Sequence, residues 1–183
     1  MSKSVNLDQV QTEIGEFIAQ SQTAILATCN SENLPEASYA AFVEENNHFY
    51  IYVSELAAHT NNLALKKQCS FMLIEPEESA KNPFARKRLS MRCQASECLR
   101  GSLDFEAVMD QFQFRFGKFI SVIRDLQDFH LYRLTPESGT YVSGFAKAFA
   151  LSGDKLAEIR HRTEKAHVSP DQETANAMAD LAE

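Results

Sequence analysis

The first part of the chain alternates between an amphipathic stretch and short apolar runs. Between residues 7 and 20 the apolar side chains recur at intervals of three and four: Leu7, Val10, Ile14, Phe17 and Ile18. This spacing predicts an α-helix with one apolar face. Apolar runs follow at 23–29, 37–45 and 48–54, separated by turn-forming Asn, Ser and Pro residues. We therefore expect a helix followed by a three-stranded meander.

The strand predicted at 88–95 is the most informative element of the chain. Its residues Leu89, Met91, Cys93 and Ala95 alternate with Arg88, Ser90, Arg92 and Gln94. Because successive side chains of a strand point to opposite faces, one face is apolar and the other is polar with two arginines. A short helix at 55–68 and a buried strand at 69–75 are predicted before it.

A longer helical region and a hairpin are predicted next. Residues 102–126 carry apolar side chains on one helical face, and Gly117 divides this region in two. The runs 128–134 and 139–145 flank the turn-like sequence TPESG. Two strand-forming runs around such a turn predict a β-hairpin.

The order of these elements indicates the fold class. Residues 152–165 are predicted to form a polar helix with Ser152 or Asp154 as its N-cap. Many short strands without repeated βαβ units favour an antiparallel sheet closed into a barrel. Small barrels often pair, because an open sheet edge must be covered. We expect an α+β, dimeric β-barrel protein, with one domain over residues 1–167 and a polar tail over 168–183.

Composition and charge narrow the class of protein. The 183 residues are 44% hydrophobic and 23% charged, which is typical of a globular domain. The net charge of −7 argues against broad contact with nucleic acid. The N-terminal sequence lacks the apolar region of a secretory signal, and no apolar run is long enough to span a membrane. The four cysteines form no C-x-x-C pair, so we expect reduced thiols and a cytoplasmic location.

Arginines and histidines are the candidate functional residues, since the phosphate-loop, serine-elbow and H-E-x-x-H motifs are absent from the sequence. Arg88 and Arg92 share a strand face. Two guanidinium groups there suit an anionic group such as a phosphate or a propionate, or else form a solvated ladder of salt bridges. His59 is either a residue of the first turn of a helix or a functional residue.

The other histidines have weaker signals. His48 begins a strand and is expected at the surface, whereas His130 is expected to form a partly solvated pair with Asp128 on one strand face. His161 and His167 are six residues apart, which is about 240° around a helix. One rigid helix therefore cannot present both to the same metal ion. The residues alone predict solvated side chains for this pair.

Several longer stretches resemble a known family. They are ATCNSENLPEASYAAFV, AAHTNNL, FMLIEPEESAKNPFARKRLS, LQDFHLYRLTPESGTYVSGFAKAF, and SGDKLAEI with the later HV. Over residues 5–168 the chain resembles the HugZ/HutZ-type haem-utilisation proteins, relatives of pyridoxamine 5′-phosphate oxidase. The resemblance implies a homodimeric, six-stranded split β-barrel that binds haem between subunits. It also implies release of the haem iron, in some members by oxidative opening of the ring.

The resemblance implies roles for individual residues as well. His167 matches the histidine that ligates haem iron, and Asp128 matches an aspartate that hydrogen-bonds this ligand across the dimer. Arg88 matches an arginine near the haem, with Arg92 on the same strand face, and His59 matches another histidine of the family. The implied activity is that of a haem oxygenase-like oxidoreductase, which requires an electron donor.

Two alternatives remain. One is an FMN-binding oxidoreductase on the same fold, in which a lysine of the helix after the third strand holds the flavin phosphate; here His59 occupies that position. The other is a haem carrier or store, which needs only the ligand histidine, its aspartate and an apolar cleft.

The sequence departs from the family pattern around His167, where Ala166 and Val168 replace glycine and arginine, and at Ala146, which replaces glycine.

Overall fold

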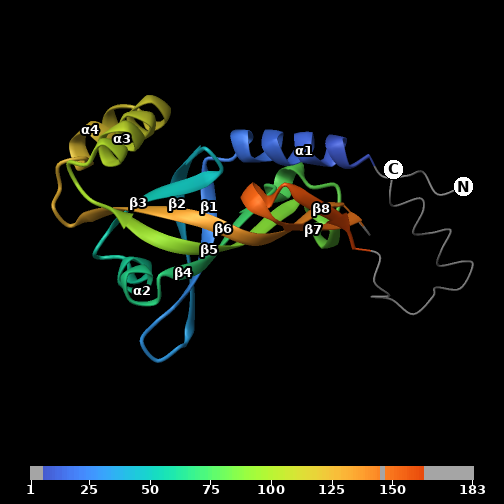
Figure 1. The fold of residues 1–183 in the computed structure, drawn as a ribbon, viewed down its shortest axis with the longest axis horizontal. Coiled ribbons are helices and arrows are strands. Elements are labelled where there is room, and N and C mark those ends of the chain that lie inside the picture. The colour runs from blue at the N-terminus through green and yellow to red at the C-terminus, as the bar shows by residue number, and fades with distance from the viewer. Residues whose placement is uncertain (1–5, 145–146, 163–183) are drawn as a thin grey trace, which may run out of the picture.

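The computed structural model describes residues 6–144 and 147–162, which fold around one antiparallel sheet (Figure 1). Its strands are β1 (Thr23–Cys29), β2 (Pro35–Glu45), β3 (His48–Ser54), β4 (Gln68–Ile74), β5 (Arg88–Cys98), β6 (Phe129–Gly144), β7 (Lys147–Ser152) and β8 (Glu158–His161). The helices are α1 (Leu7–Gln20), α2 (Ala58–Lys66), α3 (Leu103–Phe116) and α4 (Lys118–Ile123), with 3₁₀ turns η1 (Glu77–Ser79), η2 (Pro83–Ala85) and η3 (Asp154–Leu156).

Six of the strands close into a barrel. Their order is β3-β2-β1-β4-β5-β6, and a further pairing of β3 with β6 joins the two ends of the row. Strands β7 and β8 continue the sheet beyond β6, outside this ring. The predicted fold class, an α+β protein with a six-stranded antiparallel split barrel, is confirmed.

The barrel interior is an apolar core with aromatic rings at its centre. Phe42, Phe49 and Phe71 are at most 2% exposed, and their ring centroids lie 4.6 to 5.7 Å apart. The apolar face predicted for β5 is part of this core, since its four residues are at most 5% exposed. A second core lies under α3 and α4, where Tyr50, Tyr52 and other residues pack against these helices.

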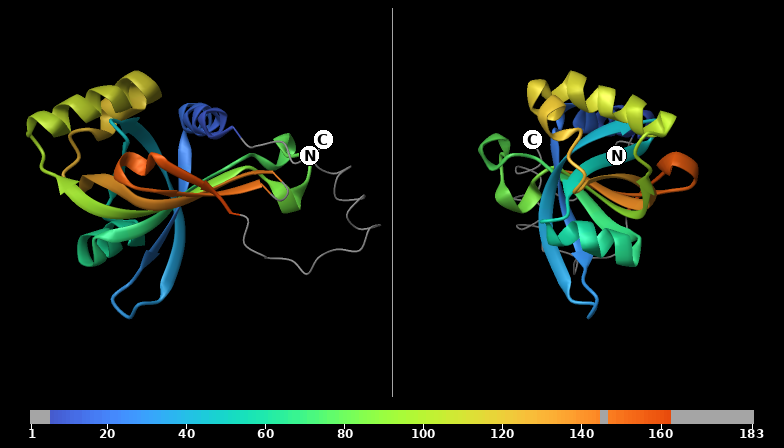
Figure 2. Two further views of the ribbon diagram at one scale, coloured as in Figure 1. Left: turned by 45° about the vertical axis from the view of Figure 1, so that its right-hand side comes forward. Right: turned by 90° about the vertical axis from the view of Figure 1, so that its left-hand side faces the viewer.

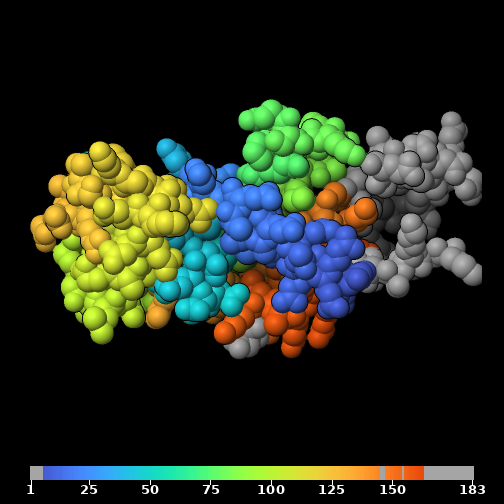
Figure 3. All heavy atoms as spheres, turned by 90° about the horizontal axis from the view of Figure 1, so that it is seen from above, coloured from blue at the N-terminus to red at the C-terminus, as the bar shows by residue number. Residues whose placement is uncertain are grey.

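The helices cover the barrel in different places (Figures 1 and 2). The predicted helix α1 begins at the N-cap Asn6 and buries Val10 and Phe17 against the barrel. Helix α2 inserts Leu63, which is fully buried in the same core. Helices α3 and α4 form a lobe at one end of the molecule, and β7 and β8 lie toward the other (Figure 3). In the described ranges no helix has the length and hydropathy that a membrane crossing needs.

The hairpin predicted around TPESG is wrong, because β6 runs unbroken through it. Pro136 pairs with Cys93, and Gly139 pairs with Met91, so the turn-like residues remain in register with β5. A register shift at Arg92/Cys93 accommodates the proline, as a β-bulge does. Gly139 fits because a Cβ there would lie 3.2 Å from the carbonyl oxygen of Ser90.

The polar helix predicted at 152–165 is also wrong over the part that the structure describes. Instead, the chain turns at Gly153, whose φ is 78°, passes through η3 and forms strand β8 against β7. The side chains of β8 alternate in burial, with Ile159 and His161 half-buried and Glu158 and Arg160 exposed. This period of two lets β8 cover the edge of β7 while Ile159 packs against the core. The division of residues 102–126 at Gly117 is confirmed by its φ of 73° between α3 and α4.

Candidate functional site

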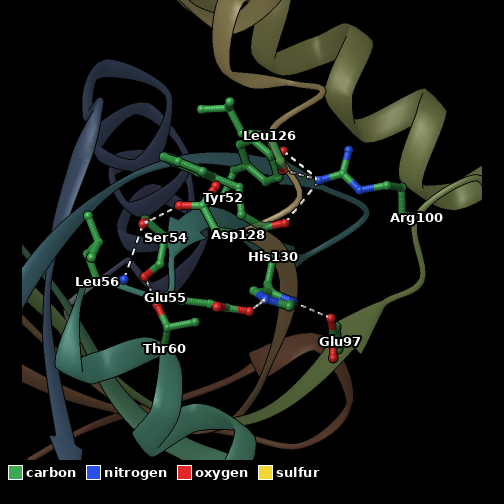
Figure 4. A network of polar contacts seen from close by, with 11 residues as sticks. Tyr52, Ser54, Glu55, Leu56, Thr60, Glu97, Arg100, Leu126, Asp128 and His130 are labelled. Atoms are coloured by element: carbon green, nitrogen blue, oxygen red, sulfur yellow. Dashed lines mark hydrogen bonds and ion pairs between the residues drawn. The ribbon is translucent and has the colours of Figure 1, made fainter.

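Asp128 immediately precedes β6, next to the point where this strand pairs with the end of β3 (Figure 4). Its carboxylate Oδ2 accepts a hydrogen bond from the Ser54 hydroxyl at 3.3 Å. Its carbonyl oxygen accepts one from the backbone N–H of Glu55 at 2.8 Å. Both the side chain and the backbone of Asp128 are thus held against the end of β3.

His130 lies two residues further along β6 and bridges two carboxylates (Figure 4). Its Nε2 is 2.8 Å from Oε1 of Glu55, and its Nδ1 is 2.7 Å from Oε1 of Glu97. These two hydrogen-bonded carboxylates, first Glu55 and then Glu97, raise the pKa of His130. The side chain is 27% exposed, so the predicted partial solvation is confirmed. The predicted pairing with Asp128 is wrong, because Glu55 and Glu97 are the bonded partners.

Helix α2 connects to Asp128 through the same serine. The Thr60 hydroxyl donates to the carbonyl of Ser54 at 2.6 Å. Two residues later, Asn62 donates from Nδ2 to the hydroxyl of Thr28 and to Oε2 of Glu36, at 3.0 and 2.7 Å. Polar side chains of α2 therefore bond to residues of β1, β2 and the end of β3.

His59 lies in the first turn of α2, as one of its two interpretations predicted, and only 8% of it is exposed. Its Nδ1 is 2.8 Å from the Ser38 hydroxyl, whereas its buried Nε2 has no hydrogen-bond partner among the described residues. Burial lowers the pKa of His59 and favours the neutral imidazole. A buried ring nitrogen without a protein partner is costly and leaves one hydrogen bond for a ligand or a water molecule.

Arg88 and Arg92 lie on one face of β5, as predicted, but far from Asp128. On β6 Arg88 pairs with Val142 and Arg92 pairs with Ser138. Asp128 precedes Val142 by fourteen residues, which corresponds to about 46 Å along an extended strand. Figure 1 shows β6 running along the length of the molecule. One chain therefore does not bring Arg88 and Asp128 together.

The two arginines make few contacts of their own. Nη1 of Arg88 donates to the carbonyl of Arg86 at 3.1 Å, and Nη2 of Arg92 is 3.5 Å from the Ser138 hydroxyl. Among the described residues no acidic side chain forms an ion pair with either arginine, so the ladder of salt bridges does not form there. Both guanidinium groups therefore present positive charge on the polar face of β5.

The remaining histidines lie elsewhere. His48 was expected at the surface but is half-buried, with its Nδ1 3.2 Å from the Thr135 hydroxyl. His161 packs its ring against Phe149, at 5.1 Å between centroids. His167, the candidate haem ligand, lies outside the described residues, as does the tail from 168 to 183.

A cavity of about 460 Å³, lined by both apolar and charged residues, lies between α1 and the barrel. Leu89 and Met91 line it from β5, and Ile14 and Ile18 line it from α1. Because β5 alternates in facing, this cavity is on the opposite side of the strand from Arg88. The cavity and the arginines therefore do not form one binding site within a chain.

The partners that hold Asp128 and His59 gave no signal in the sequence. Ser54 ends a strand that was predicted from its apolar residues, Glu55 follows it, and Ser38 lies within another strand. None carries a sequence motif. Their contacts join residues more than twenty positions apart, so only the pairing of the strands could identify them.

Known proteins with related sequences share this architecture. The family model for pyridoxamine 5′-phosphate oxidase matches residues 10–143. The haem oxygenase HutZ of Vibrio cholerae is 40% identical over 156 residues, which cover 85% of this chain and 89% of HutZ.

Solved structures agree with this relationship. The crystal structure of HutZ, a haem storage protein from Vibrio cholerae, has a TM-score of 0.67 and 41% identity, and the match covers 69% of this chain and 89% of HutZ. The crystal structure of ChuZ from Campylobacter jejuni has a TM-score of 0.80 and 32% identity, and the match covers 87% of this chain and 65% of ChuZ. The chain described here thus belongs to the pyridoxamine 5′-phosphate oxidase family and, within it, to the group that contains HutZ.

Proposed function

We propose that this protein is a cytoplasmic homodimer that binds haem between its subunits and degrades it oxidatively to release iron. His167 ligates the haem iron, Asp128 orients this histidine, and Arg88 makes an electrostatic contact with the haem, with Arg92 beside it. The 40% identity to the haem oxygenase HutZ supports this assignment. The oxidation consumes electrons, so a separate reductant acts as the electron donor.

The separation of Asp128 from the C-terminal part of the chain is the observation that carries the proposal. The backbone N–H of Arg162 donates to the carbonyl of Ala148, which pairs with Val142 on β6. His167 follows Arg162 by five residues, which span at most about 18 Å. Asp128 lies about 46 Å from Val142 along β6.

This comparison favours a shared site. Arg162 lies next to Ala148, which pairs with Val142, and His167 extends at most about 18 Å from there. It therefore does not reach the Asp128 of its own chain, which is about 46 Å from Val142 along β6. It reaches an Asp128 only when a second copy brings its own β3–β6 end to this part of the sheet. The proposed haem site is therefore built from His167 and Arg88 of one subunit and from Asp128 of the partner subunit.

The residues present fit this role chemically. The Asp128 carboxylate is already oriented by Ser54 and can accept the Nδ1–H of a ligand histidine. Such a carboxylate fixes the imidazole tautomer and increases its electron donation to iron. His59 belongs to the same end of the barrel through Thr60 and Ser54, and its free Nε2 provides one hydrogen bond for the bound ligand.

The FMN alternative fits less well. A flavin phosphate carries negative charge and is stabilised by cationic side chains. Arg88 and Arg92 supply two, but the helix after the third strand supplies His59, whose lowered pKa keeps it neutral. This side chain adds no positive charge to a phosphate site. A haem carrier without catalysis uses the same residues and differs only in turnover.

Titration with hemin tests the proposal. The wild-type protein should develop a sharp Soret band, and His167→Ala should lose it, because the iron then has no axial histidine. His161→Ala is the matched control, since His161 packs against Phe149 and is not a proposed ligand. Equal binding by His167→Ala and the wild type would contradict the assignment. A yellow protein with flavin bands and no response to hemin would indicate the FMN-binding alternative.

A further inference from the structure

Arg100, in the connection between β5 and α3, binds the segment that carries Asp128 (Figure 4). Its Nη1 donates to the carbonyl of Arg124 at 2.5 Å. Its Nη2 lies 2.8 Å from the carbonyl of Leu126 and 3.1 Å from that of Phe129. One guanidinium group thus contacts three backbone carbonyls within six consecutive residues.

Tyr52 completes this arrangement from the barrel. Nη2 of Arg100 also contacts the Tyr52 hydroxyl at 3.0 Å, and this hydroxyl donates to the carbonyl of Arg124 at 2.8 Å. The guanidinium carbon lies 5.0 Å from the centre of the Phe105 ring, a cation–π distance. Phe105 of α3 and Tyr52 of β3 therefore hold the Arg100 side chain in the position from which it contacts the segment 124–129.

Two of the three contacted carbonyls, those of Arg124 and Leu126, lie between the end of α4 and the start of β6, and the third belongs to Phe129, the first residue of β6. Carbonyl groups at and beyond the C-terminal end of a helix lack intrahelical donors, so Arg124 and Leu126 can accept hydrogen bonds from a side chain. A cation at the C-terminal end of a helix is also electrostatically favourable. The planar guanidinium spreads its donors over separate nitrogen atoms in a fixed geometry, whereas lysine carries its three donors on one nitrogen. This site therefore depends on the shape of the side chain as well as on its charge.

Asp128 lies between two of the anchored residues. Leu126 and Phe129 bind Arg100 on either side of it, and its own carbonyl binds the N–H of Glu55. Movement of the segment 124–129 would displace the Asp128 carboxylate from Ser54, because the position of the carboxylate depends on the position of its backbone. A shift of about 1 Å in a catalytic group is enough to lower a rate substantially.

We propose that Arg100 is a positioning residue, which clamps the segment 124–129 so that Asp128 meets the ligand histidine of the partner subunit in one defined orientation. This inference rests on the proposed function for the role of Asp128, whereas the clamp itself is a property of the chain. It adds Arg100 and Tyr52 to the residues on which the haem site depends. Neither of them is proposed as a haem contact.

The test uses the full-length protein with Arg100→Ala, Arg100→Lys and Tyr52→Phe. Hydrogen exchange without haem measures the clamp, and we expect the Glu55 amide and the peptide 124–130 to exchange about tenfold faster in both Arg100 variants. Resonance Raman of the ferrous haem complex then measures the iron–histidine stretching band. This band should move in the same direction in the Arg100 variants as in Asp128→Asn, with a smaller shift in Tyr52→Phe.

Arg124→Ala is the matched control. It removes the ion pairs of Arg124 with Glu106 and Asp110 on α3, at 2.5 and 2.7 Å, but keeps the backbone carbonyl that Arg100 binds. We expect wild-type exchange at Glu55 and a wild-type Raman band for this variant. If Arg100→Ala does not fold, Arg100→Lys and Tyr52→Phe provide the same comparison.

The outcomes separate the inference from the proposed function. Unchanged exchange at Glu55 in the Arg100 variants would refute the clamp. Faster exchange with a wild-type Raman band, while Asp128→Asn shifts the band, would refute positioning and leave the proposed function intact. A band that does not move even in Asp128→Asn, or a wild-type protein that forms no haem complex, would overturn the role of Asp128 and the positioning role together.

Discussion

A haem site shared between subunits makes a strict prediction for mixed dimers. His167→Ala removes the proposed ligand, and Asp128→Asn removes the carboxylate that orients it. A dimer with one subunit of each kind then has one site with both residues altered and one site with both residues intact. Because a C2 dimer has two equivalent sites, the mixed dimer should degrade haem at about half the wild-type rate. Both parent homodimers should be much slower.

The distances in the structure set the direction of this effect. His167 reaches at most about 18 Å beyond Arg162, and Asp128 of the same chain lies about 46 Å away along β6. If the site were instead formed within one chain, neither subunit of the mixed dimer would have an intact pair. Its rate would then not exceed that of the faster parent.

The assay is the loss of Soret absorbance under ascorbate and oxygen. Mixed dimers are purified after co-expression with a different affinity tag on each variant. The reciprocal control pairs a wild-type subunit with a subunit that carries both substitutions. A shared site predicts no intact site in this control, whereas a site within one chain predicts one. A mixed dimer no faster than its parents, together with a half-active control, would refute the shared site.

Two further predictions concern stability. Contacts with two glutamates raise the pKa of His130, so its contribution to stability should be complete below the ordinary histidine pKa and lost as pH rises through the raised value. We therefore expect the Tm of His130→Ala to fall less than that of the wild type between about pH 6 and pH 9. The same dependence of Tm on pH in both proteins would contradict this. Gly139→Ala should lower the free energy of unfolding by about 1–3 kcal/mol in urea, because its Cβ would crowd β5. Gly15→Ala is the control, since it meets open space on a helix and should stabilise by about 0.5–1 kcal/mol; equal effects at both sites would refute the packing argument.

The sequence predicted the parts of the fold that follow from local periodicity. The helix α1 and the alternation of β5 were identified because each buries one continuous face. The turn residues Thr135–Gly139 gave the wrong result because pairing with β5 outweighs their local preference for a turn. Strand β8 was missed for a related reason. Its four residues are too few for the sequence alone to identify a strand, and only pairing with the edge of β7 makes them one.

The candidate site was predictable only in part, and for a similar reason. The family resemblance made Asp128 and His59 candidates, but their neighbours Ser54 and Ser38 come from other strands. Arg100 gave no signal in the sequence, since it is one arginine in a polar connection. Its partners are backbone carbonyls, which any residue supplies. Such contacts depend on the path of the chain and have no counterpart in a residue pattern.

The length of β6 has a consequence for the concentration at which this protein works. A strand of 16 residues holds the two halves of the proposed site too far apart to act within one molecule. A single subunit would then carry His167 and Asp128 but could not form a complete site with them. Dilution below the dissociation constant of the dimer would therefore abolish activity without unfolding the chain, by mass action alone.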